Sequence, residues 1–152
     1  MTARATSTTL SYVLTLSIAT MLVGGLIVAG GTFVKDHREQ VIRQELQVIG
    51  EHVASNVDQV DRYARAAEDL AAANVSQTFP DDVTGATYVV RLVDDGGDAR
   101  LFLNATRPSV SVDVNVTTAT PIATGSNASG GSVVVKCQVD GGDCNKILID
   151  NA

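Results

Sequence analysis

Tryptophan is absent from this chain of 152 residues, and lysine, proline and histidine are scarce, with three, three and two copies. Two cysteines are too few for a scaffold held together by several disulfides. Only 11 Lys and Arg residues stand against 17 Asp and Glu residues, for a net charge of -6. This balance argues against nucleic acid as a partner, because nucleic-acid binding requires a positively charged surface.

Charge is missing altogether from one long stretch. Residues 5–34, ATSTTLSYVLTLSIATMLVGGLIVAGGTFV, contain no charged side chain, and from Leu10 onward they are mostly Leu, Ile, Val, Ala and Gly. As a helix, residues 10–34 extend roughly 37 Å, enough to cross a hydrocarbon layer of about 30 Å. The stretch exceeds the apolar region of a cleaved secretory signal and lacks a clear A-x-A site before Lys35. We therefore favour an uncleaved anchor, with a tail at 1–9 and a transmembrane helix at 10–34.

The flanks of this helix give conflicting indications of orientation. Lys35, Arg38 and Arg43 follow the helix and only Arg4 precedes it, which favours a cytoplasmic C-terminal side. Four N-x-[ST] sequons favour the opposite orientation, because sequons are glycosylated only outside the cytoplasm. We predict a single-pass cell-membrane protein with an extracellular C-terminal head. The candidate glycosylated residues are Asn74, Asn104, Asn115 and Asn127.

Residues 35–74 are predicted to form an amphipathic helix that ends at Asn74. Apolar residues recur there at spacings of three and four, which indicates a single buried face. The members of this apolar stripe are Ile42, Leu46, Ile49, Val53, Val57, Val60, Ala64, Ala67 and Ala71. Gly50 is the one weak point of the helix. The stripe is longer than a small head can cover, so we expect part of it to pack on the head and part on a neighbouring chain.

Residues 75–152 are predicted to form a small antiparallel β head, with strands beyond Phe79-Pro80. Pairing Leu92 with Leu101 places Gly96-Gly97 in a two-residue hairpin turn. Residues 110–116 alternate strictly between Val and polar side chains, which is typical of a half-buried strand. Residues 118–131, TATPIATGSNASGG, read as a flexible polar loop. The fold class that follows is α+β.

The last hairpin, around Gly141-Gly142, contains a conflict of register. A loop of odd length aligns Val133, Val135 and Val139 with Ile147 and Ile149 but puts the two cysteines on opposite faces. A two-residue turn puts both cysteines on one face and exposes part of the apolar set, and a bulge near the turn satisfies both needs. The candidate disulfide joins Cys137 to Cys144.

No motif indicates catalysis or a cofactor. The sequence contains no G-x-S-x-G, no Gly-rich phosphate loop and no H-E-x-x-H. The two Asp-Gly-Gly-Asp stretches contain carboxylates suited to Ca²⁺, yet they lack the spacing of a twelve-residue calcium loop and fit hairpin turns better. His37 and His52 have no second ligand at metal-binding spacing. We expect no enzymatic activity, no metal and no cofactor.

The order of these segments resembles type IV pilins and pseudopilins: a polar N-terminus, an uncharged apolar helix, an amphipathic helix and a small β head. The stretch 7–51 is also similar to uncharacterised pilin-like membrane proteins of haloarchaea, and the excess of Asp over Glu, 13 to 4, is typical of halophilic surfaces. The resemblance implies cleavage of a precursor beside Arg4 and Ala5. It also implies that the apolar helix first anchors the subunit in lipid and later packs against other subunits.

The expected function is that of a structural, pilin-like or minor pseudopilin-like subunit of a cell-surface filament or secretion assembly. Its partners are membrane lipid and other pilin-like subunits or copies of itself. Gly25 and Ala29 form a small-xxx-small pair that permits close helix approach in lipid. The residues expected to pack between subunits are Leu14, Ile18, Gly25, Ala29, Ile42, Leu46, Ile49 and Val53. The alternative is a membrane-anchored extracellular domain for binding or adhesion.

Overall fold

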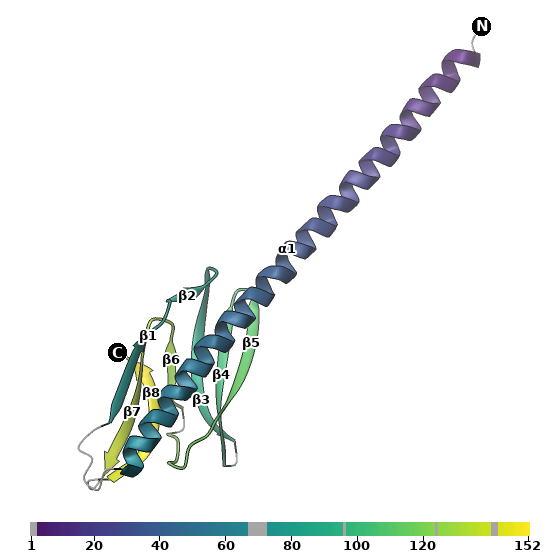
Figure 1. Cartoon of the computed structure of the whole chain (residues 1–152). Coiled ribbons are helices and arrows are strands. Elements are labelled where there is room, and N and C mark those ends of the chain that lie inside the picture. The colour runs from purple at the N-terminus through teal and green to yellow at the C-terminus, as the bar shows by residue number, and fades with distance from the viewer. Residues whose placement is uncertain (1–2, 67–72, 96, 124, 141–142) are drawn as a thin grey trace. The chain divides into compact units, whose positions relative to one another are not determined.

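Figure 1 shows the computed structural model, which describes residues 3–66, 73–95, 97–123, 125–140 and 143–152. The chain divides into two compact units, Met1–Arg38 and Glu39–Ala152. The described part of the first unit is helical, and that of the second, the head, combines a helical segment with eight strands. The α+β class predicted from the sequence is confirmed.

The long helix α1 (Ala3–Ala66) differs at both ends from the sequence prediction. Residues 3–9, expected as a tail, belong to the helix. Asn74, expected to end the amphipathic helix, instead begins strand β1 (Asn74–Thr78). This strand has no recognisable sequence pattern, because its single large apolar residue is Val75 and its partner strand lies far along the chain.

Two antiparallel sheets form the head. In the first, β1, β7 (Ser132–Asp140) and β8 (Asp143–Asn151) lie in that order. In the second, the order is β2 (Asp82–Val83), β3 (Ala86–Asp95), β4 (Asp98–Thr106) and β5 (Ser109–Val116), and β6 (Asn127–Ser129) also pairs with β3. Ser126 links the sheets, because its carbonyl accepts from the Leu92 N–H at 3.1 Å and its hydroxyl donates to the Ile149 carbonyl at 3.0 Å.

The β3–β4 hairpin has the register predicted from its apolar residues. Leu92 pairs with Leu101, and Val90 pairs with Leu103. All four side chains are fully buried. The turn lies between Asp95 and Asp98, which pair with each other. Alternation alone sets this register because a slip by one residue would turn every one of these side chains outward.

A bulge resolves the conflict in the β7–β8 hairpin. Asp140 pairs with Asp143 and Val139 with Cys144, but Gln138 pairs with Lys146, so Asn145 is left without a partner residue. The extra residue shifts the register and aligns Cys137 with Ile147 further along the strands. A two-residue turn and a continuous apolar face therefore coexist, as the bulge alternative anticipated.

The apolar stripe of α1 packs against these sheets and completes the head's core. Figure 1 shows this part of the helix lying across the strands. Six stripe residues are buried in one cluster with side chains from both sheets: Ile42, Leu46, Ile49, Val53, Val57 and Val60. The expectation that Ile42, Leu46, Ile49 and Val53 pack between subunits is therefore wrong, because the chain's own strands already cover them. Ala67 and Ala71 lie outside the described residues.

Gly50 allows this close approach between helix and sheet. A Cβ atom at this position would lie 2.8 Å from both Leu103 Cδ1 and Val114 Cγ2, well inside normal contact. Leu103 is fully buried, and the β-branched Val114 has few alternative rotamers, so neither side chain has an easy way to move. The apparent weak point of the helix is therefore a position at which the sheet packs close to the helix backbone.

The described residues of the polar stretch 118–131 are more ordered than the predicted flexible loop. Ile122 is buried and bridges to Ile147, and Ala128 in β6 is buried opposite Val90. Isolated apolar residues in a Ser-, Thr- and Gly-rich stretch carry no periodicity, which is why the sequence did not reveal their burial.

Candidate functional site

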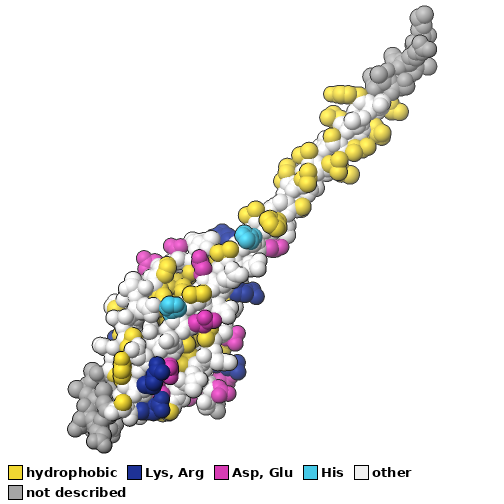
Figure 2. Space-filling model, viewed as in Figure 1, with side chains coloured by type: hydrophobic (Ala, Val, Ile, Leu, Met, Phe, Trp, Pro, Cys, Tyr) yellow, Lys and Arg dark blue, Asp and Glu magenta, His cyan; other side chains and the backbone are white. Residues whose placement is uncertain are grey.

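The helical segment Leu10–Val34 presents an apolar surface on every side. Fourteen of its large apolar side chains are exposed, from 54% for Ile18 to 81% for Met21. Figure 2 shows hydrophobic and uncharged side chains along this segment, whereas acidic and basic side chains gather on the head. By length and composition, α1 is the one helix in the described part of the chain that is able to cross a membrane. This agrees with single-pass anchoring.

Four hydroxyl groups of this segment are satisfied within the helix. Thr15, Ser17, Thr20 and Thr32 each donate to the backbone carbonyl four residues earlier, at 2.8–3.2 Å. A hydroxyl bonded in this way does not need water, so the polar residues of the segment are compatible with a lipid environment.

The predicted packing residues in this segment are all exposed. Leu14 and Ile18 are 63% and 54% exposed, and Gly25 and Ala29 are exposed as well. Apart from the neighbouring residues and the helix's own backbone, no described atom lies within 4 Å of a Cβ built on Gly24 or Gly25. Within the described part of the chain these two glycines therefore pack against no other element, and their surface is open to lipid or to another helix. Arg4 and Ala5, the predicted processing site, lie in the first turns of α1, and their side chains fall outside the described part.

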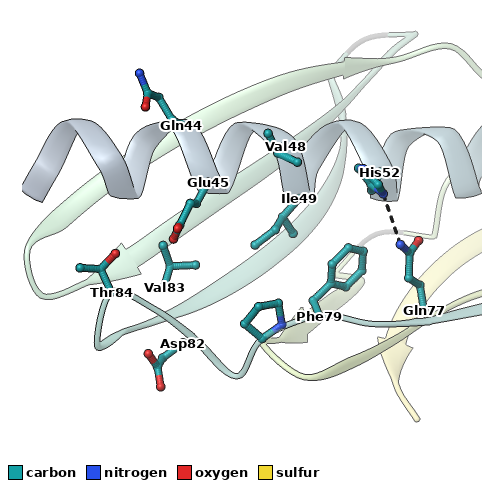
Figure 3. A pocket seen from close by; sticks show the side chains of 11 residues that line it. Gln44, Glu45, Val48, Ile49, His52, Gln77, Phe79, Asp82, Val83 and Thr84 are labelled. Atoms are coloured by element: carbon teal, nitrogen blue, oxygen red, sulfur yellow. Dashed lines mark hydrogen bonds between the residues drawn. The ribbon is translucent and has the colours of Figure 1, made fainter.

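A second candidate site is an open groove in the head, with a volume of about 580 Å³ (Figure 3). Its apolar lining comes from two places: α1, and the segment from the end of β1 through β2. The lining residues are Gln44, Glu45, Val48, Ile49, His52, Gln77, Phe79, Pro80, Asp82, Val83 and Thr84. This volume is in the usual range for ligand pockets.

Hydrogen bonds hold the walls of the groove together. The Asn56 amide donates to Gln77 Oε1 at 2.8 Å, and Gln77 Nε2 lies 3.2 Å from His52 Nδ1 (Figure 3). Because Gln77 Oε1 already accepts, its NH₂ group is left to donate to His52. The His52 ring also meets the Phe79 ring edge-on, with centroids 6.5 Å apart. Helix α1 and strand β1 are thus joined along the groove.

The opposite wall is fixed by buried Tyr88. Its hydroxyl donates to the carbonyl of Pro80 at 2.8 Å. Burial, together with the nearby charge of Asp81, raises the pKa of Tyr88 to about 12, so the phenol remains a donor at physiological pH. The sequence did not reveal this groove, since its residues come from segments with no shared motif.

Asp61 is a buried carboxylate that the sequence analysis did not single out. Its Oδ1 accepts from the N–H groups of Ala119 and Thr120 and from the Thr118 hydroxyl, at 2.9–3.2 Å. Its Oδ2 pairs with Arg65 at 2.9 Å. Burial acts to raise the pKa of Asp61, but the hydrogen bonds from Thr120, Thr118 and Ala119 outweigh it and the pKa is lowered. Asp61 therefore anchors α1 to the segment after β5.

Cys137 and Cys144 form a disulfide across the β7–β8 hairpin, with Cα atoms 5.6 Å apart. The bond closes a small loop that contains the hairpin turn, and Cys144 directly precedes the bulged residue Asn145. It is typical of proteins that fold in an oxidising compartment.

The sequon asparagines all lie in strands. Asn74, Asn115 and Asn127 are exposed, whereas Asn104 is half-buried and accepts a hydrogen bond from Ser111. The first three therefore present their amides to solvent. The two histidines lie apart, and in the described ranges no group of three or more His, Cys, Asp or Glu side chains is placed to hold a metal ion.

Comparison with known families matches residues 1–148 of this chain to one family model. The chain belongs to DUF7266, a family of unknown function. No curated protein and no solved structure matches it. Since the match includes both the apolar segment and the head, the DUF7266 model describes a chain that combines the two.

Proposed function

We propose that the chain is a membrane-anchored, pilin-like structural subunit of a cell-surface filament or secretion assembly, without catalytic activity. The observation that carries this proposal is the exposed apolar surface of Leu10–Val34. Such a surface is too large to remain in water, so lipid or other helices must cover it. A subunit that is first stored in the membrane and then assembled needs both environments: lipid before assembly and the helices of other subunits after it.

The open glycine-containing face supports assembly through helix contacts. At about 100° per residue, Leu14, Ile18, Gly25 and Ala29 share one face, and Leu16, Val23 and Ile27 lie opposite. Small residues let backbones approach closely in lipid. The head is also compatible with the proposal. Its apolar stripe is buried against the chain's own strands. Contacts between subunits are therefore assigned to the segment Leu10–Val34.

Cysteine crosslinking in native membranes tests this proposal. We expect Gly25→Cys to form disulfide-linked dimers on oxidation. Combining Gly25→Cys with Val23→Cys on the opposite face is expected to produce a ladder of higher multimers, because each subunit of an open-ended assembly has neighbours on two faces. Absence of any crosslink at Gly25, or recovery of the chain in the aqueous fraction, would contradict the proposal.

Processing and orientation require separate measurements. Intact mass of the membrane-purified chain is expected to show loss of residues 1–5, as cleavage at Ala5 requires. The disulfide and the exposed sequons support an extracellular head, so protease added to intact cells is expected to remove it. A full-length chain with a protected head would contradict both expectations.

The alternative function is that of an anchored extracellular domain for binding or adhesion. The groove beside His52 favours this alternative, because its volume and apolar lining suit a ligand. A chain that stays in the membrane fraction without crosslinking through Gly25 or Val23 would favour this alternative over the assembling subunit.

A further inference from the structure

The outermost strand on each side of the head has an open edge. β1 ends the first sheet and β5 ends the second, and in the described residues each pairs with a single strand, β7 and β4 respectively. Figure 1 shows β1 and β5 on opposite sides of the head. Edge strands are usually protected from further pairing by Lys, Pro or a bulge. Neither strand contains Lys, Arg or Pro, and neither ladder has a bulge, so both edges are able to accept another strand.

Backbone groups of β1 point off its edge. The Phe79 N–H donates to the Gly131 carbonyl at 2.9 Å, on the β7 side, and the Ala73 carbonyl accepts from the Cys137 N–H at 2.8 Å. In an antiparallel ladder, alternate residues bond in opposite directions. Every second residue between Ala73 and Phe79 therefore directs its N–H and C=O away from β7. These residues are Asn74, Ser76 and Thr78, and all three are exposed.

The same alternation applies to β5. The Leu92 N–H donates to the Ser126 carbonyl at 3.1 Å, on the β6 side of β3, so the next residue, Arg91, bonds on the β4 side to its partner Phe102. Phe102 then has no backbone group left for Asp113, its neighbour in β5. Asp113 therefore directs its N–H and C=O off the edge. The residues of β5 that share this direction are Ser109, Ser111, Asp113 and Asn115, and all are exposed.

The two edge strands run in opposite directions within the head. β1 is parallel to β8, and β5 to β3, because one antiparallel strand separates each pair. The described part of the segment between β5 and β7 runs parallel to β8, and its β6 portion is antiparallel to β3. The contacts that align this segment with β8 join Ile122 to Ile147, Ser126 to Ile149 and Ser129 to Asn151. Two heads placed side by side in one orientation thus present an antiparallel pair of edges.

We propose that β5 of one copy pairs with β1 of a second copy, so that neighbouring heads join edge to edge. In the central register Ser76 lies opposite Asp113, and half-buried Val75 lies opposite half-buried Val114. The core-facing side chains of both strands then stay on one side of the joined sheet. Each of the three outward residues of β1 exchanges both backbone bonds with its partner, for about six hydrogen bonds in total.

A second copy supplies the missing strand because every copy carries both kinds of edge. This step rests on the proposed function, since copies anchored in one membrane share an orientation and are held at high effective concentration. Pairing β5 with another β5 would reverse one head and bring two Asp113 carboxylates close together, which is unfavourable. β1 has no charged residue. Because each subunit keeps one free edge of each kind, the contact repeats along a row of heads.

Paired cysteines in native membranes test this geometry. In the central register Thr78 lies opposite Ser111. We expect a short bis-maleimide to link Thr78→Cys to Ser111→Cys when the two variants are co-expressed, and to link neither variant to itself. One chain with both changes is expected to form a ladder of multimers. Thr78→Cys co-expressed with Arg91→Cys is the matched control, because Arg91 is exposed on β3, which has strands on both sides.

The outcomes separate this contact from its alternatives. Ser111→Cys that crosslinks alone as readily as in the mixture indicates β5–β5 pairing and overturns the proposal. Absence of Thr78–Ser111 links while Gly25→Cys still crosslinks overturns the head contact and leaves the membrane contact standing. A chain recovered in the aqueous fraction contradicts the anchor, and Thr78–Ser111 links in that fraction would still support the edge contact.

Proline substitution tests whether backbone hydrogen bonds form the contact. Asp113→Pro removes an N–H that points off the edge, so we expect it to lower Thr78–Ser111 crosslinking tenfold or more while the head stays folded. Asp113→Ala also removes the carboxylate but keeps the N–H, and it is expected to crosslink normally. Equal crosslinking by the two variants overturns the proposal. Ser76→Pro against Ser76→Ala repeats the comparison on β1, and thermal melting of each variant verifies folding.

Discussion

At the scale of single residues, the head depends on positions that have no conspicuous sequence signal. Asp61 is the clearest example, because its carboxylate accepts hydrogen bonds from three successive residues of a distant segment. Burying such a charge is costly unless its hydrogen bonds are complete. Asp61 and Gly50 lead to separate predictions.

Replacing Asp61 by Asn is expected to destabilise the head by about 1–2 kcal/mol at neutral pH, because a neutral amide accepts more weakly than a carboxylate. The folded-state pKa of Asp61 is lowered, so its contribution is fully present above the unfolded value near 3.9 and is lost as pH falls through the folded value. Denaturant unfolding of both proteins between pH 7 and pH 3 measures this.

Asp58→Asn is the matched control, since Asp58 pairs with Arg62 at the surface. Exposed pairs of this type contribute less than about 1 kcal/mol. A stability difference between the Asp61 variant and the native chain that does not shrink in acid would show that the carboxylate charge is not the source of the anchoring.

Replacing Gly50 by Ala is expected to reduce stability by about 1 kcal/mol. The methyl group would overlap Leu103 and Val114, and overpacking typically costs about 1–3 kcal/mol, of which about 1 kcal/mol is offset by the better helix propensity of Ala. Gly24→Ala, at an open position, is the control and should not destabilise. Thermal unfolding of both variants measures these effects. A gain in stability for Gly50→Ala would show that the sheet residues move aside at little cost.

At the scale of elements, alternation and helical periodicity were the basis of the sequence prediction, and short elements without either pattern, such as β1 and β6, were not predicted. The Leu92–Leu101 register followed from alternation. The stripe of α1 also had the right residues, yet periodicity says only that a face is buried, not what buries it. For this reason the partner of Ile42 and Leu46 was misassigned.

The missed elements are those held by non-local or polar contacts. β1 is defined by pairing with β7 some sixty residues away, and such pairing leaves little trace in a five-residue stretch. The groove likewise arises only when α1 and the segment after β1 meet. Of the candidate site, sequence predicted the apolar segment and the cysteine pair, whereas Asp61 and the groove required the structure.

The β7–β8 hairpin gives a prediction at this scale. Removing the disulfide by Cys137→Ser with Cys144→Ser is expected to destabilise the head by about 2–3 kcal/mol, because the bond closes only a small loop in the unfolded chain. Thermal unfolding of the double variant measures this. Mass spectrometry of the native protein under non-reducing conditions supplies the check: a count of two free thiols contradicts the bridge.

At the scale of the whole molecule, the boundary at Arg38 and Glu39 separates an apolar segment from a head that includes part of the same helix. The head cannot be equated with its strands, since the stripe residues of α1 belong to its core. This division predicts how the chain tolerates truncation.

A chain of residues 39–152 is expected to be soluble and to unfold cooperatively, because it keeps every described core residue. A chain of residues 75–152 is expected to aggregate or remain unfolded, because it lacks the helix that covers both sheets. Circular dichroism melts and size-exclusion chromatography distinguish the two. A folded 75–152 fragment would show that the helix is dispensable to the head.

The long-range pairing of β1 with β7 also has a consequence for biosynthesis. The apolar face of α1 leaves the ribosome well before Lys136, which pairs with Asn74 to close the first sheet. Until that later stretch emerges, Val57 and Val60 have no complete partner surface. A nascent chain therefore passes through a period in which a helix destined for the interior is uncovered, and we expect its yield in cells to depend on chaperones or on rapid translation of the final strands.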